Sequence, residues 1–179
     1  MSVDPESMNI IISHIIEQFN EIQNGKPWIG STFECKLKEI DPDSAFVRPR
    51  EDLHCVAEIL SHLTFWREEA ILKIKTGTGS KTDDCEENWL PVETLRAKGW
   101  ARIKSEHEKS LSELLDLLGK KDDDFLDQDY YDTDFKGRFN YSFLINGMLH
   151  HDLYHLGQLG TTIRHLLRTD TKKSPGRKK

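Results

Sequence analysis

The spacing of apolar residues is the feature that most constrains the fold, because they recur every three or four positions in four long segments. We expect these segments at about 8–23, 51–75, 91–118 and 139–167. This period places the apolar side chains on one face of an α-helix. Polar or glycine-rich stretches separate the segments, and the chain has neither an alternating β-branched run nor an internal repeat. The sequence therefore predicts an all-α protein built as a bundle of four helices.

Local signals mark several helix ends. Ser31 stands three residues before Glu34, which is the spacing of a capping box and predicts a short helix in the first connection. The stretch "GTGS" follows Lys75 and predicts the end of the second helix there. Pro91 suits the first turn of the third helix.

The length of 179 residues suits one domain, which we expect to cover residues 1–170. The last residues, 171–179, are basic and contain Pro and Gly, so they predict a flexible, solvated tail. The net charge of −6 argues against general nucleic-acid binding, because phosphate affinity needs clustered Lys and Arg. The three cysteines (Cys35, Cys55 and Cys85) are widely spaced, which favours neither a disulfide framework nor a thiolate zinc site.

The opening residues carry acidic side chains and only a short apolar run, which is not the pattern of a secretory signal. No apolar stretch approaches the roughly 18 residues needed to span a membrane. We therefore expect a cytoplasmic protein that binds neither nucleic acid nor membrane.

The fourth helical segment carries His151 and His155, four residues apart. On a helix their side chains stand within about 40° of each other, so both imidazoles can reach one ion. The pattern is not the HExxH of metalloproteases, because Asp152 stands at the place of the Glu. His150 and His165 point nearly opposite the apolar arc and are expected at the surface. Two histidines one turn apart can also be satisfied structural residues.

A third ligand would come from a facing helix, and His62 is the best placed candidate. It lies just beyond the flank formed by Ile59 and Trp66, so it points toward a seam between helices. Glu58 and Glu69 lie on the same side and could orient an imidazole or act as a base.

Two other histidines rank lower. His54 lies at a different helical angle from His62, and we rate it below His62 as a ligand. His107 lies on the inner face of the third helix, where we expect a structural role.

The motifs together resemble the DinB/YfiT-like superfamily. The resemblance rests on "GMLHHDLYHLGQL", on "HCVAEILSHLTFWREEAIL" upstream, on "GKPWIGSTFECKLKEIDPDSAFVRP" and on "NWLP", and it covers about 25–167. The final motif, His-x-x-x-His-x-x-Gln, is fairly specific in this context. An additional His150 stands beside the first ligand of the motif, but the four-residue spacing to His155 favours His151.

The resemblance implies a four-helix bundle with a crossover connection and a divalent metal held by His62, His151 and His155. Some relatives are S-transferases or isomerases that use low-molecular-weight thiols such as bacillithiol, mycothiol or glutathione, and others have no known activity. Homodimers are common in the superfamily. We expect a homodimer here too, with Trp28 and Tyr154 as aromatic residues that need not be internal.

Three neutral imidazoles leave coordination positions open, as in catalytic rather than structural zinc sites. An open position could hold water, which gives a hydrolase, or a thiol, which gives a nucleophile for S-transfer. Imidazole ligands suit zinc or nickel best here, with iron, manganese or copper also compatible. Gln158 faces the same seam, but an amide is a weak ligand, so we expect it beside the site rather than on the metal.

The sequence and the resemblance together favour a metal-dependent enzyme acting on a small molecule, such as a thiol-dependent S-transferase or a related detoxification enzyme. The alternatives are a metal-binding dimer without turnover, a metal-dependent hydrolase, and a metal-free bundle with core histidines. A concave pocket at the metal would favour an enzyme, whereas a fully enclosed ion would favour a structural role.

Overall fold

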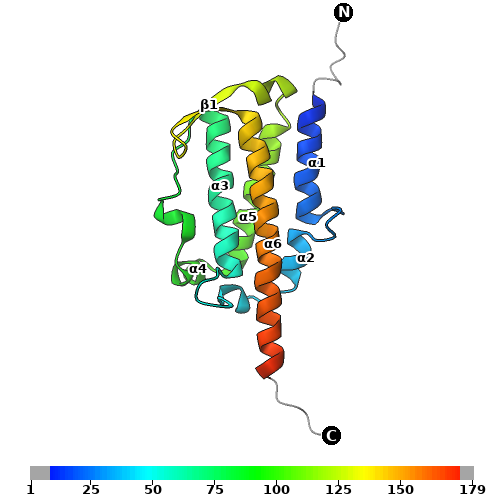
Figure 1. The fold of residues 1–179 in the computed structure, drawn as a ribbon, viewed down its shortest axis with the longest axis vertical. Helices are drawn as coiled ribbons and strands as arrows, with labels where there is room; N and C mark the ends of the chain where they lie inside the picture. Colours follow the sequence, from blue (N-terminus) through cyan, green and yellow to red (C-terminus); the bar gives the residue numbers. More distant parts are fainter. Residues whose placement is uncertain (1–8, 174–179) are drawn as a thin grey trace, which may run out of the picture.

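Four long helices lie side by side in the computed structural model, which describes the backbone of residues 9–173 and the side chains of residues 9–168. They are α1 (Ile10–Asn24), α3 (Val56–Thr76), α5 (Trp100–Leu118) and α6 (Tyr141–Lys173), as Figure 1 shows. The prediction of an all-α four-helix bundle is confirmed.

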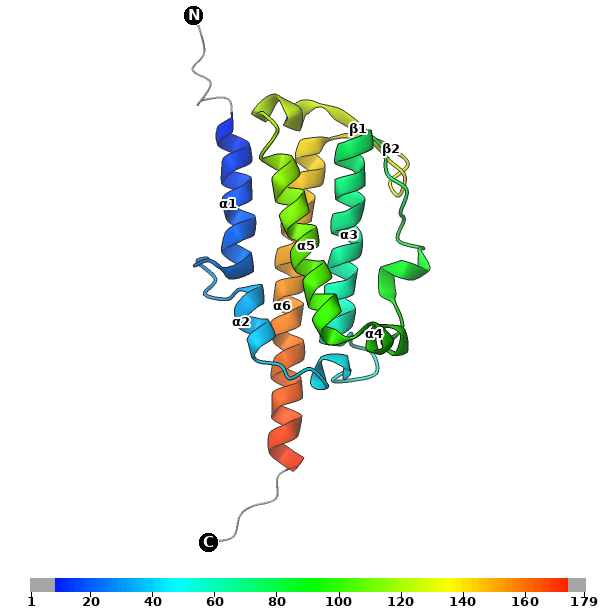
Figure 2. The same ribbon diagram turned by 180° about the vertical axis from the view of Figure 1, so that it is seen from behind.

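The connections make α3 and α5 parallel neighbours. Figures 1 and 2 show that α1 and α6 run in one direction and that α3 and α5 run in the other. Residues 77–91 therefore return along the side of the bundle from the end of α3 to the start of α4, before α5 begins. This is a crossover connection, and it passes along α3.

Short elements fill the connections. They are α2 (Phe33–Lys38), η2 (Ser44–Phe46), η3 (Glu86–Trp89), α4 (Val92–Lys98), η4 (Asp123–Asp127), β1 (Asp129–Asp132) and β2 (Gly137–Asn140). Strands β1 and β2 form an antiparallel hairpin, with Tyr130 opposite Phe139. The hairpin is tied to the end of α3, because the Tyr131 amide donates to the Gly77 carbonyl at 2.9 Å.

The core fills the space between the four helices. Helix α1 buries one face, made of Ile12, Ile15, Phe19 and Ile22, as the apolar period predicts. Helix α3 packs against α5, α6 and η3, so its side chains are buried on more than one face. That position explains why α3 carries several buried polar residues, which need partners inside the protein.

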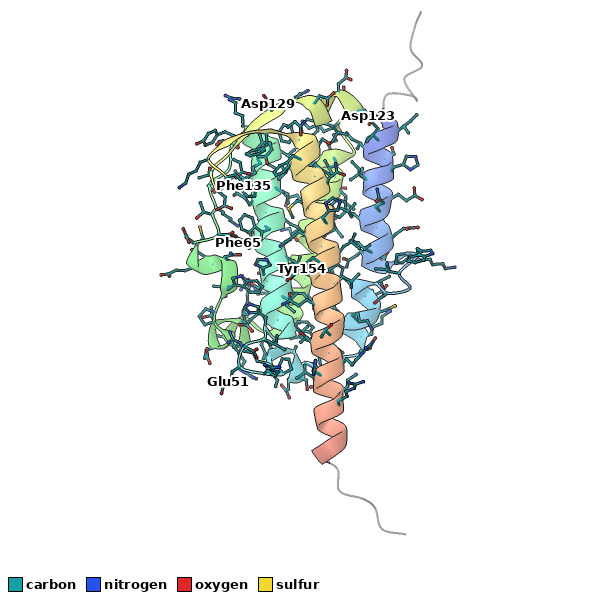
Figure 3. The ribbon with its side chains drawn as sticks, viewed as in Figure 1. Glu51, Phe65, Asp123, Asp129, Phe135 and Tyr154 are labelled. Carbon is teal, nitrogen blue, oxygen red and sulfur yellow. The ribbon has the colours of Figure 1, made fainter. Side chains whose placement is uncertain are left out.

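Helix α1 receives its N-terminal cap from a distant part of the chain. The Asp123 carboxylate accepts hydrogen bonds from the amides of Ile11 and Ile12 at 3.0 and 2.9 Å. Figure 3 labels Asp123 beside the start of α1. An anion at a helix N-terminus satisfies free amides and interacts favourably with the helix dipole.

Some predicted boundaries were wrong. The second helix begins at Val56 rather than near residue 51, because the Glu58 carboxylate caps its N-terminus by accepting the Cys55 amide at 2.8 Å. Helix α2 is capped by Thr32, not Ser31, and the Thr32 hydroxyl accepts the Cys35 amide at 3.1 Å.

The third predicted helix is two helices. Gly99 adopts φ +87° between α4 and α5, a backbone conformation that favours glycine and interrupts the helical hydrogen bonds. The hairpin formed by β1 and β2 was not predicted. Helix α6 continues to Lys173, so residues 171–173 of the expected tail are helical, and the remainder of that tail lies outside the described residues. None of the described helices has the length and apolar character needed to cross a lipid bilayer.

Candidate metal centre

Three imidazoles from two helices meet beside the crossover connection. The Nε2 atom of His151 lies 3.0 Å from Nε2 of His62 and 3.1 Å from Nε2 of His155. One nitrogen from each ring falls in a set whose members all lie within 4.8 Å of one another. Helix α3 supplies His62, and α6 supplies the other two from adjacent turns. The structure thus brings together the three histidines that the sequence proposed as ligands.

His62 is oriented by the residues of η3. Its Nδ1 donates to the backbone carbonyl of Asn88 at 3.2 Å. The Asn88 side chain is held in turn, because its Oδ1 accepts the Trp66 indole N–H at 3.0 Å. Because Nδ1 of His62 carries the proton, its Nε2 presents a lone pair to the other two rings.

His155 is oriented in the same way by its own helix. Its Nδ1 donates to Oε1 of Gln158 at 2.7 Å, which leaves Nε2 as a lone pair. Metal-binding histidines usually donate their second ring N–H to such an acceptor. Gln158 therefore contacts the imidazole of His155.

His151 stands between the two lone pairs. Its Nδ1 is buried and has no hydrogen-bond partner among the described side chains. A neutral His151 can direct at most one N–H toward the other rings, so the protein's own protons cannot satisfy both contacts. A cation shared by the three Nε2 atoms would satisfy all of them.

The three rings also resist protonation. Burial, reinforced by the neighbouring His155, lowers the pKa of His62 to about 4. Burial and then the charge of His155 lower the pKa of His151 to about 3. Burial also lowers the pKa of His155, although its bond to Gln158 opposes the change. The rings are thus neutral at physiological pH, which is the form that binds metal.

The donor set fits a divalent ion. Two nitrogens bound to one zinc ion at about 2.0–2.1 Å in tetrahedral geometry lie about 3.3 Å apart. The observed separations of 3.0 and 3.1 Å are close to that value. Neutral imidazole is also among the preferred ligands of zinc and nickel.

An indole ring separates His62 from a fourth histidine. Trp89 stacks on His62 with ring centroids 3.9 Å apart and on His54 at 3.7 Å. His54 is therefore near the cluster but on the far side of the Trp89 ring, and it is not part of the set of converging nitrogens. His150 and His165 are exposed and are also outside that set.

A buried ion pair braces the two helices that carry the cluster. The Arg67 guanidinium donates to Oδ2 of Asp152 at 2.7 and 3.2 Å, and neither side chain is exposed. Arg67 also donates to the carbonyl of His107 at 3.1 Å, which joins α5 to the same contact. Burial, reinforced by Arg67, lowers the pKa of His107 well below its usual value, so this histidine is neutral and structural, as its position in the sequence suggested.

The two carboxylates considered as bases have other partners. Glu58 is buried, caps α3 and pairs with Arg48. Glu69 accepts the Ser80 amide at 2.9 Å and lies 3.6 Å from the Lys73 ammonium. Neither carboxylate is joined to the three imidazoles by a hydrogen bond within residues 9–168, and a role for either as a base stays a prediction.

A pocket of about 340 Å³ opens onto the cluster, and His62 and His151 form part of its wall. It lies between α3 and α6 and extends to the hairpin. Gly147, one turn before His151, also lines it, and a Cβ atom placed there would have no heavy atom within 4 Å. The absence of a side chain at Gly147 therefore leaves space beside His151.

Sequence reasoning missed the partners that orient the rings. Asn88 and Trp89 belong to "NWLP", which we used only as a mark of resemblance. Asp152 was noted only as the residue that replaces a Glu. Its position directly after His151 places it about 100° further round the helix, on the apolar face with buried Ile145 and Leu149, where a carboxylate needs a partner from a neighbouring helix.

Comparison with known proteins agrees with this site. The family model of the DinB superfamily matches residues 32–159, more than half of the chain, and includes all three histidines. No curated protein matches the chain. The chain therefore belongs to the DinB superfamily, and its three-histidine cluster fits a metal-binding protein.

Proposed function

We propose that this member of the DinB superfamily is a metal-dependent enzyme that acts on a small molecule. His62, His151 and His155 would hold one divalent ion, with zinc or nickel preferred. The observation that carries the proposal is the pocket of about 340 Å³ that reaches His62 and His151. Structural zinc normally has four protein ligands, whereas a catalytic ion has three and an open position.

The chain's own residues prepare this site for an ion. Asn88 and Gln158 hold the protons of His62 and His155 on Nδ1, so that both Nε2 atoms stay available. Burial keeps the rings neutral. A bound ion would supply a Lewis acid that lowers the pKa of a coordinated water or thiol.

Thiol-dependent transfer is the reaction that we favour, with a low-molecular-weight thiol as one substrate, and hydrolysis is the second reaction compatible with an open position. We place the protein in the cytoplasm, where such thiols stay reduced. A third candidate is a dimer that binds the metal without turnover. It is favoured by aromatic residues at the surface, since Trp28 is 99% exposed and Tyr154 is 69% exposed.

The proposal can be tested by filling the pocket without touching the cluster. In Gly147→Leu a side chain would enter the space beside His151, and replacing glycine within a helix favours folding. The matched control is Gly157→Leu, on the same helix, where a Cβ also meets nothing within 4 Å but the pocket is not involved.

Both variants should keep the metal content of the wild type, measured by elemental analysis. Turnover in a screen of cellular thiols with electrophilic acceptors should be lost in Gly147→Leu and kept in Gly157→Leu. Equal turnover in the two variants, or no turnover by the metal-loaded wild type with any thiol or hydrolysable ester, would contradict the proposal.

A further inference from the structure

The pocket beside the cluster has a wall formed largely by apolar side chains. These side chains come from α3, the hairpin and α6, and they are Trp66, Phe135, Phe143, Leu144 and Met148. Figure 3 labels Phe135 in the hairpin at the side of the bundle. A volume of about 340 Å³ is at the small end of the range of roughly 300–1,000 Å³ typical of ligand sites.

Lys73 is the single lysine or arginine in the lining of this pocket, and two carboxylates already neutralise its charge. Its ammonium lies 2.8 Å from the Asp132 carboxylate and 3.6 Å from that of Glu69. The Lys73 side chain is only 4% exposed, and Tyr130 donates a further hydrogen bond to Asp132. Lys73 is therefore not free to bind an anionic group of a ligand.

Asp83 and Asp134 also line the pocket. They are close together, because the Asp83 amide donates to the Asp134 carboxylate at 2.9 Å. Neither carboxylate forms an ion pair with Lys or Arg within the part of the chain whose side chains are described. Burial, and then the charges of Asp134 and Asp84, raise the pKa of Asp83. An anionic group of a ligand placed beside Asp83 and Asp134 would therefore be repelled by their negative charge.

We infer that this pocket selects a small molecule with a metal-binding group at one end and an apolar, ring-sized body that carries no anionic group. The inference rests on the proposed function, because the metal-binding end requires an ion at the three histidines. It goes further in naming the class of molecule that the pocket accepts and the class that it rejects. Asp83 and Asp134 are the residues that determine this specificity.

Two thiols with the same phenylethanethiol skeleton test the inference. 2-Phenylethanethiol carries a neutral ring, and 4-(2-mercaptoethyl)benzoate carries the same ring with a carboxylate at the far end. Their dissociation constants would be measured by titration calorimetry with the zinc-loaded protein. The carboxylate of the benzoate is repelled by Asp83 and Asp134, so the benzoate should bind at least about tenfold more weakly.

The charge variants identify the residues responsible. In the double variant Asp83→Asn/Asp134→Asn the two affinities should converge to within about threefold, because the repulsion is removed while the amides keep hydrogen-bonding capacity. The control is Asp116→Asn/Asp124→Asn, which removes the same charge from exposed positions outside the pocket and should leave the discrimination unchanged.

Phe143→Ala tests the apolar wall, since it should weaken binding of both thiols, whereas Ile11→Ala, at an exposed position on α1, should weaken neither.

The outcomes distinguish failure of the metal site from failure of the selectivity inferred for the pocket. Failure of the wild type to bind zinc would overturn the proposed function itself. If zinc binds but the benzoate binds as tightly as the neutral thiol, or if neither thiol binds, the inference is overturned while the metal site stands. Discrimination that survives Asp83→Asn/Asp134→Asn also overturns it, because the charge of these two carboxylates would then not be its cause.

Discussion

Nε2 of His62 and Nε2 of His151 lie 3.0 Å apart, although the two residues are separated by 89 positions in the chain. Both nitrogens belong to neutral rings, and the proton of His62 is held on the opposite side of its ring by Asn88. One N–H of His151 can satisfy this contact or the contact with His155 but not both, whereas a shared cation would satisfy both.

Removing the side chain of Gln158 should weaken the metal site without abolishing it. Gln158→Ala deletes the acceptor that holds the proton of His155 on Nδ1. Loss of such an indirect contact typically costs about 10–100-fold in metal affinity or activity. Competition with a chelator would measure the change in zinc affinity, and Gln158→Glu should restore most of it. An affinity as low as that of a histidine variant would instead make Gln158 a ligand.

The stability of the metal-free protein should fall as the pH is lowered below about 6.5. The pKa values of His62 and His151 are depressed to about 4 and about 3 in the folded protein, from an ordinary value of 6.5. Between 6.5 and these values the unfolded chain binds protons that the folded protein does not, so the free energy of unfolding decreases. It should level off about one pH unit above 6.5, where the histidines are neutral in both states.

Urea unfolding of the chelator-treated protein from pH 8 to pH 5 would measure this slope. The double variant His62→Gln/His151→Gln should show a shallower dependence, with the contribution of buried His107 retained. An identical slope in the variant would mean that these two rings do not titrate as their burial requires.

We expect the buried Arg67–Asp152 pair to affect stability mainly through the unpaired charge that remains when one partner is removed. Arg67→Met leaves Asp152 buried without its cation, which typically costs about 3–5 kcal/mol of stability. The double variant Arg67→Met/Asp152→Asn should be less destabilised than the single variant. Thermal unfolding of the two proteins compares them, and a larger loss in the double variant would show that the pair itself is the main source of stability.

We also predict a homodimer. The indole of Trp28 is almost fully exposed and Tyr154 projects from α6, as labelled in Figure 3. Light scattering at micromolar concentration should give about twice the chain mass of 20.8 kDa, and Trp28→Ser/Tyr154→Ser should shift the mass downward. A wild-type mass at 20.8 kDa would refute the prediction.

Periodicity predicted the long helices and the phase of α6 because those properties are local. The spacing of His151 and His155 was enough to direct both rings toward one point, and the position of His62 beside Trp66 indicated a seam between helices. The break at Gly99 was missed because glycine is tolerated inside many helices, and only the change in chain direction requires its positive φ.

Contacts between distant segments could not be predicted in the same way. The carbonyl of Asn88 reaches His62 because the crossover connection runs beside α3, and that path depends on the whole bundle. The acidic stretch before α6 has no alternating apolar pattern, so the hairpin it contains left no strand signal. Its place is fixed by long-range contacts such as that between Lys73 and Asp132.

The metal content of five single variants tests the central claim most directly. His62→Ala, His151→Ala and His155→Ala each remove one of the converging nitrogens, whereas His150→Ala and His165→Ala change exposed residues of α6. After identical purification, elemental analysis should find about one divalent ion per chain in the wild type and in the last two variants, and much less in the first three. Retention of the ion by all five variants, or its loss from His150→Ala with retention by His151→Ala, would contradict the site described.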